Sequence, residues 1–340
     1  MPPIPLTAEE RLPKLAIKLL SSHLPSLELP LLLDMAIPVI DFSKLDGKER
    51  AETLAKIANG CEEWGFFQLV NHGIPVELLE RVKKVSSECY KLRAEAFKKS
   101  NPVQLLNKLE DKEGENSNVQ RLDDVDWEDV FVLQDDNEWP SNPPEFKETM
   151  KEYRRELKKL AEKLMEIMDE NLGLQKGCIK NAFSGNGEHE PFFGTKVSHY
   201  PPCPRLDLVQ GLRAHTDAGG VILLFQDDHV GGLQMLKDGQ WIDVQPVANA
   251  IVINTGDQIE VLSNGRYKSV WHRVLATSNG NRRSIASFYN PSPKATIAPA
   301  TPGEVAQPLY PKFVFGDYMD VYVKQKFQPK EPRFEAVAAI

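Results

Sequence analysis

The hydrophobic pattern changes its period near residue 190, and this change constrains the fold most. Before it, apolar residues recur at three-and-four spacing, as in residues 148–172 ahead of Gly173, which predicts amphipathic helices. After it, short apolar runs such as residues 221–225 and 250–254 are separated by Gly-Gly, Asp-Gly and Asn-Gly pairs, which indicate short antiparallel strands. We therefore expect an α+β chain with a mainly β core: a double-stranded β-helix (jelly roll) with N-terminal helices and a C-terminal helical tail.

The same patterns divide the chain into segments. We predict an N-terminal extension (1–34), a helical N-terminal part (35–190), a jelly-roll catalytic core (191–300) and a C-terminal helical tail (301–340). Acids, Asn and Gly around a short apolar patch predict a mobile flap near residues 101–139. A length of 340 residues would allow two domains, but large β enzymes often fold as one unit, so we expect one functional domain.

Composition excludes several classes of protein. The net charge of -8, with no block of Lys and Arg, disfavours nucleic acid and anionic membranes as partners. Four scattered cysteines argue against a disulfide scaffold. The apolar residues of 14–33 are interrupted by Pro25 and Pro30, so no membrane span is expected. We predict a cytoplasmic protein; its oligomeric state is not predicted by the sequence.

Three residues form a candidate metal site. His215 and Asp217 are two apart, so in an extended chain both side chains point to the same face. His272 lies on a later predicted strand and can supply a third ligand. Two imidazoles and one carboxylate on one face suit Fe(II) and leave positions open for substrate and O2, whereas a structural zinc site closes with four ligands. A His-x-Asp pair alone also arises by chance, so its neighbours decide its meaning.

A second pair of candidate site residues begins about ten residues after His272. Arg282 and Ser284 share one face of a predicted strand. A guanidinium with a nearby hydroxyl can bind a carboxylate, because the fork of donors matches its two oxygens. The pair alone is equally compatible with a surface arginine that ends a strand.

A third group alternates on another predicted strand. Lys196, Ser198 and Tyr200 point to one face and could line the same cavity. His199 points to the opposite face, so we do not expect it to bind the metal.

Further motifs carry a resemblance to known proteins. IPVIDF (37–42), GFFQLVNHG (65–73) and YPPCP (200–204), together with the ordered His-x-Asp, distal His and Arg-x-Ser, resemble the plant family of non-haem iron and 2-oxoglutarate-type dioxygenases. Within it, residues 35–333 resemble the branch of 1-aminocyclopropane-1-carboxylate oxidases. The motifs behind this second resemblance are FGTKVS (193–198), GLRAHTDAGG (211–220), LLFQDD (223–228), SIASFYNP (284–291), YPKFVF (310–315) and KFQPKEPRFE (326–335).

The resemblance implies an activity and cofactors. Such an enzyme converts 1-aminocyclopropane-1-carboxylate with O2 and ascorbate to ethylene, CO2 and cyanide at a mononuclear Fe(II) site, with bicarbonate or CO2 as activator. The alternative is a 2-oxoglutarate-dependent hydroxylase of a plant hormone or flavonoid precursor, which needs the same three ligands. The tail favours the oxidase, since the ordinary 2-oxoglutarate enzymes lack it.

The resemblance also implies residue roles. Arg282, Ser284, Tyr200 and Lys196 are implied in binding substrate or bicarbonate. Three tail residues are implied in activity and in handling ascorbate or bicarbonate: Lys326, Lys330 and Arg333. The division of bicarbonate and ascorbate among the basic residues stays open. Judged by charge alone, the tail would be a solvated basic helix face.

Overall fold

Two β-sheets form the centre of the fold in the computed structural model, which describes residues 36–110, 122, 124–300 and 308–339. The predicted extension of residues 1–34 lies outside these ranges. The larger sheet has seven strands in the order β1 (Val39–Asp41), β2 (Phe66–Val70), β9 (Ile251–Thr255), β6 (Val221–Gln226), β11 (Arg282–Asn290), β4 (Phe192–Tyr200) and β3 (Asp129–Leu133). The smaller has four: β5 (Leu212–His215), β10 (His272–Val274), β7 (Leu233–Lys237) and β8 (Gln240–Asp243).

The strand pairing is that of a jelly roll. Within both sheets all pairs are antiparallel except β1 with β2. Two further short strands, β12 (Thr296–Ile297) and β13 (Phe313–Val314), pair antiparallel just before the C-terminal helices. The expected double-stranded β-helix with helices before and after it is therefore confirmed.

Most helices lie in the first half and at the end of the chain, as the hydrophobic periodicity predicts, but one short helix, α6 (Asp257–Leu262), lies within the segment predicted as the jelly-roll core. The other helices are α1 (Arg50–Asn59), α2 (Val76–Phe97), α3 (Asn101–Glu110), α4 (Phe146–Leu172), α5 (Cys178–Phe183), α7 (Phe315–Gln325) and α8 (Glu331–Ala338), with a 3-10 turn at Phe42–Asp46 and a π-helical turn at Gly60–Trp64. The long helix α4 ends where Gly173 adopts a left-handed conformation (φ 72°), which only glycine takes up without strain.

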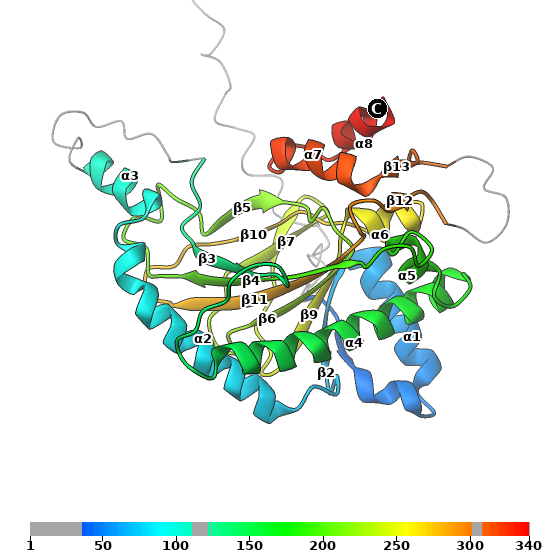
Figure 1. The fold of residues 1–340 in the computed structure, drawn as a ribbon, viewed down its shortest axis with the longest axis horizontal. Helices are drawn as coiled ribbons and strands as arrows, with labels where there is room; N and C mark the ends of the chain where they lie inside the picture. Colours follow the sequence, from blue (N-terminus) through cyan, green and yellow to red (C-terminus); the bar gives the residue numbers. More distant parts are fainter. Residues whose placement is uncertain (1–35, 111–121, 123, 301–307, 340) are drawn as a thin grey trace, which may run out of the picture. The chain divides into compact units, whose positions relative to one another are not determined.

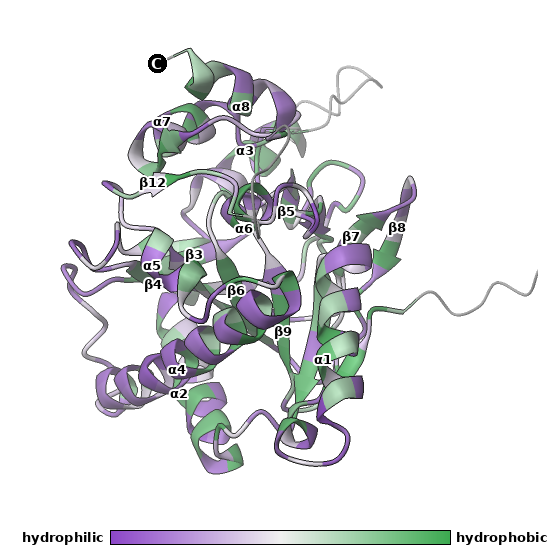
Figure 2. Ribbon diagram, turned by 90° about the vertical axis from the view of Figure 1, so that its right-hand side faces the viewer, coloured by the Kyte–Doolittle hydropathy of each residue, from purple (hydrophilic) through white to green (hydrophobic). Residues whose placement is uncertain are grey.

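Helices α2 and α4 lie against one face of the larger sheet (Figure 1). Helix α4 turns apolar residues such as Met150, Leu157 and Leu164 inward, and its colouring alternates between hydrophobic and hydrophilic residues (Figure 2). A second, smaller apolar cluster, which includes Phe66 and Met235, lies between the two sheets. The space between the sheets is only partly filled, and the candidate site lies there.

The segment predicted as a flap, residues 101–139, is partly described. It contains α3 and the edge strand β3, which pairs with β4. Between them, Trp127 is buried, packs edge-to-face on Phe97 and donates its indole N–H to the carbonyl of Pro201. The described end of this segment is thus attached to the sheet; movement of the segment stays a prediction, as do the segment boundaries near residues 190 and 300.

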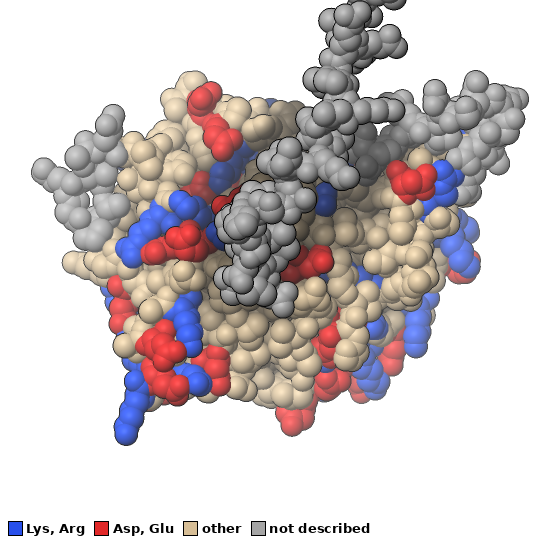
Figure 3. Space-filling view, turned by 180° about the vertical axis from the view of Figure 1, so that it is seen from behind, with Lys and Arg blue, Asp and Glu red and all other residues tan. Residues whose placement is uncertain are grey.

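Charged side chains of both signs lie next to one another on the face shown in Figure 3. The structure also contains exposed ion pairs, such as Arg50 with Glu170 and Arg81 with Glu152, and an exposed pair stabilises a protein by only about 0–1 kcal/mol. Among the described helices, none has the length and apolar composition needed to cross a membrane.

Candidate metal centre and substrate cavity

The structure brings His215, Asp217 and His272 together, and we call these three residues the triad. His215 ends β5 and His272 begins β10, directly opposite in the antiparallel register. The Nε2 atoms of His215 and His272 lie 3.6 and 3.4 Å from the two carboxylate oxygens of Asp217. One ligand atom from each residue lies within 4.8 Å of the others. All three are buried on one side of a cavity, and two imidazoles with one carboxylate fit Fe(II).

Neighbouring groups fix the orientation of each triad residue. The Nδ1–H of His215 donates to the carbonyl of Arg213 at 2.8 Å, and that of His272 donates to the carbonyl of Val270 at 3.1 Å. Both rings therefore present Nε2 to the shared centre. The amide of Asn254 donates to Asp217 at 2.8 Å. Burial, and then the nearby His272, hold the pKa of His215 well below its usual range, so its imidazole is neutral and able to bind a metal.

The triad faces a cavity of about 240 Å³ between the two sheets. His215 and His272 come from the smaller sheet, and the larger sheet contributes Lys196, Tyr200, Arg282 and Ser284, which we call the basic wall. The remaining lining is largely apolar, including Phe66, Leu212, Ile222, Leu224, Leu233, Val274, Ala286 and Phe288. The cavity thus combines a metal-binding side with a cationic side, as expected for a small anionic substrate bound beside a metal.

Arg282 is the centre of the basic wall. It is 1% exposed, and it donates to the Ser284 hydroxyl at 3.1 Å and to Gln226 Oε1 at 3.0 Å. Its guanidinium also lies 5.1 Å from the centre of the Tyr200 ring. A surface arginine at a strand end is therefore the wrong interpretation. The buried Nε of Arg282 has no partner within the described residues, so the wall has a donor available for a ligand.

A residue that the sequence analysis did not identify organises the other half of the wall. Glu128 accepts hydrogen bonds from Lys196 Nζ at 2.8 Å and from the Tyr200 hydroxyl at 2.6 Å. Burial alone would raise the pKa of Glu128, but the ammonium of Lys196 and these hydrogen bonds outweigh burial and lower that pKa. Glu128 is ionised and paired. No motif contains it, because it lies 68 residues from Lys196.

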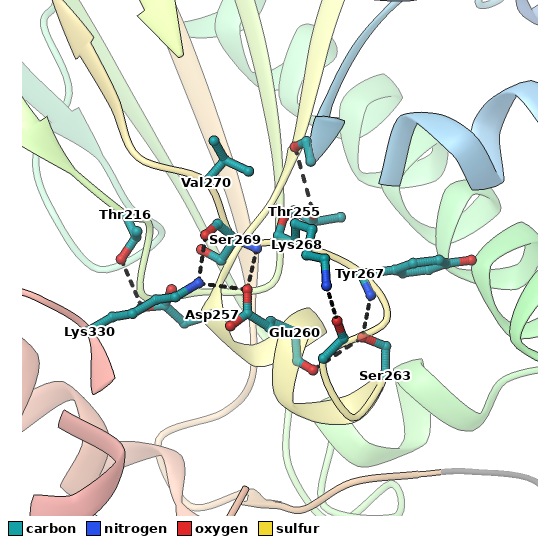
Figure 4. Close-up of polar contacts among 12 residues, drawn as sticks. Thr216, Thr255, Asp257, Glu260, Ser263, Tyr267, Lys268, Ser269, Val270 and Lys330 are labelled. Atoms are coloured by element: carbon teal, nitrogen blue, oxygen red, sulfur yellow. Dashed lines mark hydrogen bonds and ion pairs between the residues drawn. The ribbon is translucent and has the colours of Figure 1, made fainter. Parts of the chain in front are cut away.

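The three basic tail residues occupy different environments. Lys326, just after α7, lines the cavity, where burial and the charge of Lys196 lower its pKa. Lys330 instead donates to Glu260 Oε2 at 2.7 Å and to the carbonyl of Ser269 at 2.8 Å (Figure 4). The structure therefore contradicts a solvated basic helix face.

Arg333 is fully buried and contacts the chain between two triad residues. Its guanidinium donates to the Thr216 hydroxyl at 2.9 Å and forms an ion pair with Asp257 at 3.2 Å. Thr216 lies between the triad residues His215 and Asp217 in the sequence. The hydroxyl of Thr216 also donates to Asp257 (Figure 4). On α7, Tyr322 donates to the carbonyl of Thr216 at 2.8 Å. Arg333 thus contacts the loop that carries Asp217, and it does not line the cavity.

Phe327 is a second residue that the sequence analysis did not identify. Its ring lies 3.7 Å from the guanidinium carbon of Arg213 and edge-on to the ring of His215, with centroids 6.2 Å apart. Phe327 directly follows Lys326 in the sequence. An aromatic residue beside a basic one was the available signal, and the charge pattern alone does not reveal it.

One other residue, His199, lies where the sequence predicts. His199 stacks against Tyr90 and hydrogen-bonds the side chain of Asn281, away from the triad. Cys61 is buried in the main core, and burial raises the pKa of its thiol.

Comparison with known proteins identifies the family. Residues 192–291 match the 2OG-Fe(II) oxygenase superfamily, and residues 37–155 match the N-terminal family described as non-haem dioxygenase in morphine synthesis. A 1-aminocyclopropane-1-carboxylate oxidase of Musa acuminata is 83% identical over 310 residues, 90% of this chain and 100% of that protein. The 1-aminocyclopropane-1-carboxylate oxidase 5 of Arabidopsis thaliana is 70% identical, with 90% and 100% covered.

Solved structures show the same fold. JOX2 in complex with 2OG, Fe and JA superposes with a TM-score of 0.73 at 34% identity, covering 89% of each chain. Full-length Neurospora crassa T7H in complex with alpha-KG has a TM-score of 0.67 at 28% identity, covering 83% of this chain and 94% of that one. The matched families, the high identity along the chain and the shared fold agree: this chain belongs to the 1-aminocyclopropane-1-carboxylate oxidase family of non-haem Fe(II) oxidoreductases, within the 2OG-Fe(II) oxygenase superfamily.

Proposed function

We propose that this enzyme converts 1-aminocyclopropane-1-carboxylate and O2 to ethylene, CO2 and cyanide, with ascorbate as reductant and bicarbonate or CO2 as activator. The identity to the oxidases of Musa and Arabidopsis supports the reaction. The observation that carries it is the cavity of about 240 Å³ with the triad on one side and a buried arginine on the other. A cytoplasmic location stays a prediction from the sequence.

We assign the metal to His215, Asp217 and His272, because their donor atoms converge and are already oriented by backbone carbonyls. Bound there, Fe(II) supplies the redox chemistry and open positions for substrate and O2. The chain itself orients the substrate and keeps bulk water out of a cavity with mostly apolar lining. A small substrate offers few groups for side chains to bind, so it suits a site in which the metal supplies the chemistry and the chain supplies orientation.

The basic wall would recognise an anion. The guanidinium of Arg282 and the Ser284 hydroxyl form a unit on β11 that can bind a carboxylate. Lys196 and Tyr200 on β4 add further hydrogen-bond donors beside this unit, since Tyr200 lies directly opposite Arg282 in the sheet. Both the substrate carboxylate and bicarbonate fit this chemistry, and we propose that they bind at this wall.

We propose two different tasks for the tail. Lys326 lines the cavity, so it can contact ascorbate or bicarbonate directly. Lys330 and Arg333 are positioning residues, because their partners are Glu260, Asp257 and the backbone near the triad. They would act on activity through the position of the triad, without touching the ligand.

The proposal is tested by a headspace assay. Purified protein receives Fe(II), ascorbate, bicarbonate and 1-aminocyclopropane-1-carboxylate, with no 2-oxoglutarate, and ethylene is measured by gas chromatography. We expect ethylene and equimolar cyanide, both dependent on iron. A parallel arm with 2-oxoglutarate measures succinate, which a hormone or flavonoid hydroxylase would release. Absence of ethylene from folded, iron-loaded protein would refute the proposed reaction.

A further inference from the structure

Glu128 is a buried carboxylate that the roles above do not include. Its side chain is 7% exposed, and it immediately precedes the edge strand β3. The neighbouring residues attach this part of the chain to the sheet: Asp126 accepts from the backbone N–H of Arg213 at 2.9 Å, and Trp127 donates to Pro201. Contacts of Asp126 and Trp127 therefore hold Glu128 against Lys196 and Tyr200, which line the cavity.

A single carboxylate reaches several groups of the basic wall. Lys196, Ser198 and Tyr200 alternate along β4, and all three line the cavity. Lys196 Nζ lies 2.8 Å from both oxygens of Glu128, and the Tyr200 hydroxyl donates to one of them at 2.6 Å. The Ser198 hydroxyl also lowers the pKa of Glu128. Lysine has a flexible stem and a point charge, so an ion pair is needed to hold its ammonium in one place.

The cations Lys196 and Arg282 of the basic wall differ in the charge of their hydrogen-bond partners. Lys196 is neutralised by Glu128. Arg282 hydrogen-bonds the uncharged side chains of Ser284 and Gln226. Asp227 and Glu128 act on Arg282 through space, but within the described residues its hydrogen bonds go to uncharged groups, so its guanidinium gains from direct contact with an incoming anion. Lys196 and Tyr200 would then shape the wall beside that anion.

We propose that Glu128 is a positioning residue for substrate binding: it fixes Lys196 and Tyr200 on the cavity wall and leaves the charge of Arg282 for the substrate carboxylate. This inference rests on the proposed function, since it takes 1-aminocyclopropane-1-carboxylate as the ligand. It predicts an effect on binding of the carboxylate substrate rather than on the metal.

The test compares Glu128→Gln with Asp129→Asn. Glutamine keeps the size of the side chain and removes its charge. Asp129 is a matched control, because it is the next residue, is also buried and pairs with Arg93 instead of the cavity residues. Binding of 1-aminocyclopropane-1-carboxylate to the Fe(II)-loaded enzyme is measured by calorimetry without O2, together with the Kd for iron, KM and kcat.

We expect Glu128→Gln to weaken substrate binding and raise KM by about tenfold, the size of one charge-assisted hydrogen bond. The iron affinity should stay within about twofold, and Asp129→Asn should leave substrate affinity unchanged. In a Lys196→Met background, Glu128→Gln should have little further effect, because its main partner is already gone.

Three outcomes would overturn the proposal: unchanged substrate affinity in Glu128→Gln, an equal loss in Asp129→Asn, or full additivity with Lys196→Met. If Glu128→Gln does not fold, Tyr200→Phe removes one of the two contacts and leaves the carboxylate; an unchanged KM in that variant would also contradict the proposal. Failure of the wild-type enzyme to bind 1-aminocyclopropane-1-carboxylate would instead refute the proposed function, so the two failures are distinguishable.

Discussion

The triad and the basic wall face each other across one cavity, but they are held in place differently. His215 and His272 each donate to a backbone carbonyl only two residues earlier in the chain. Arg282 and Lys196 depend on side chains 56 and 68 residues away in the sequence. The geometry of the triad histidines is thus largely local, whereas the geometry of the basic wall depends on how distant segments pack.

This difference separates metal binding from substrate binding. Changes in the triad should affect the metal first, and changes in the basic wall should affect the carboxylate substrate while the metal still binds. The tail is an exception, because it supports the triad through distant contacts of Arg333 and Lys330. The following variants test these statements.

The largest effect is expected for Asp217→Asn. Asparagine keeps the shape and a contact to Asn254 but removes the carboxylate. Since loss of a group that merely orients a metal ligand costs about 10–100-fold in affinity or activity, loss of a ligand should cost at least about 100-fold. Iron titration and the ethylene assay measure the two losses. His199→Ala is the control, because this histidine is outside the triad; undiminished iron binding in Asp217→Asn would disprove the assigned site.

Removal of the buried charge in Arg333→Met should destabilise the fold. It leaves Asp257 without its cation, and breaking a buried pair from one side costs about 3–5 kcal/mol. Urea unfolding should show that loss, with weaker iron binding as a consequence. The double variant Asp257→Asn/Arg333→Met should recover much of the stability. If Arg333→Met were as stable as wild type and only required more ascorbate or bicarbonate, Arg333 would be a ligand-binding residue instead.

A smaller and more selective effect is expected for Arg282→Lys. Lysine keeps the charge but loses the fork of donors, so KM for 1-aminocyclopropane-1-carboxylate should rise by about tenfold. Iron affinity should not change, because the triad does not depend on this side chain. Arg283→Lys is the matched control, since this neighbour pairs with Asp227. A parallel loss of iron in Arg282→Lys would show that the two sides of the cavity are not independent.

The same contrast explains which parts of the site the sequence predicts. His215 with Asp217, and Arg282 with Ser284, are two apart on strands, so their shared faces follow from local geometry. The helix before Gly173 follows in the same way from its periodicity. Glu128 was missed because only the pairing of β3 with β4 brings it to Lys196. Arg333 was recognised as important, but its burial against Asp257 follows from tertiary packing that no local pattern contains.

The smallest effect is expected for Phe327→Ala, which tests whether the tail also supports the local contacts of the triad. Phe327 stacks on the guanidinium of Arg213, and the backbone carbonyl of Arg213 orients the ring of His215. A partly exposed cation–π contact contributes about 0.5–1 kcal/mol, so iron affinity should fall by about two- to fivefold. Phe327→Leu retains apolar bulk without the aromatic ring and separates packing from cation–π attraction. Equal iron affinity in all three proteins would show that the backbone hydrogen bond alone orients His215.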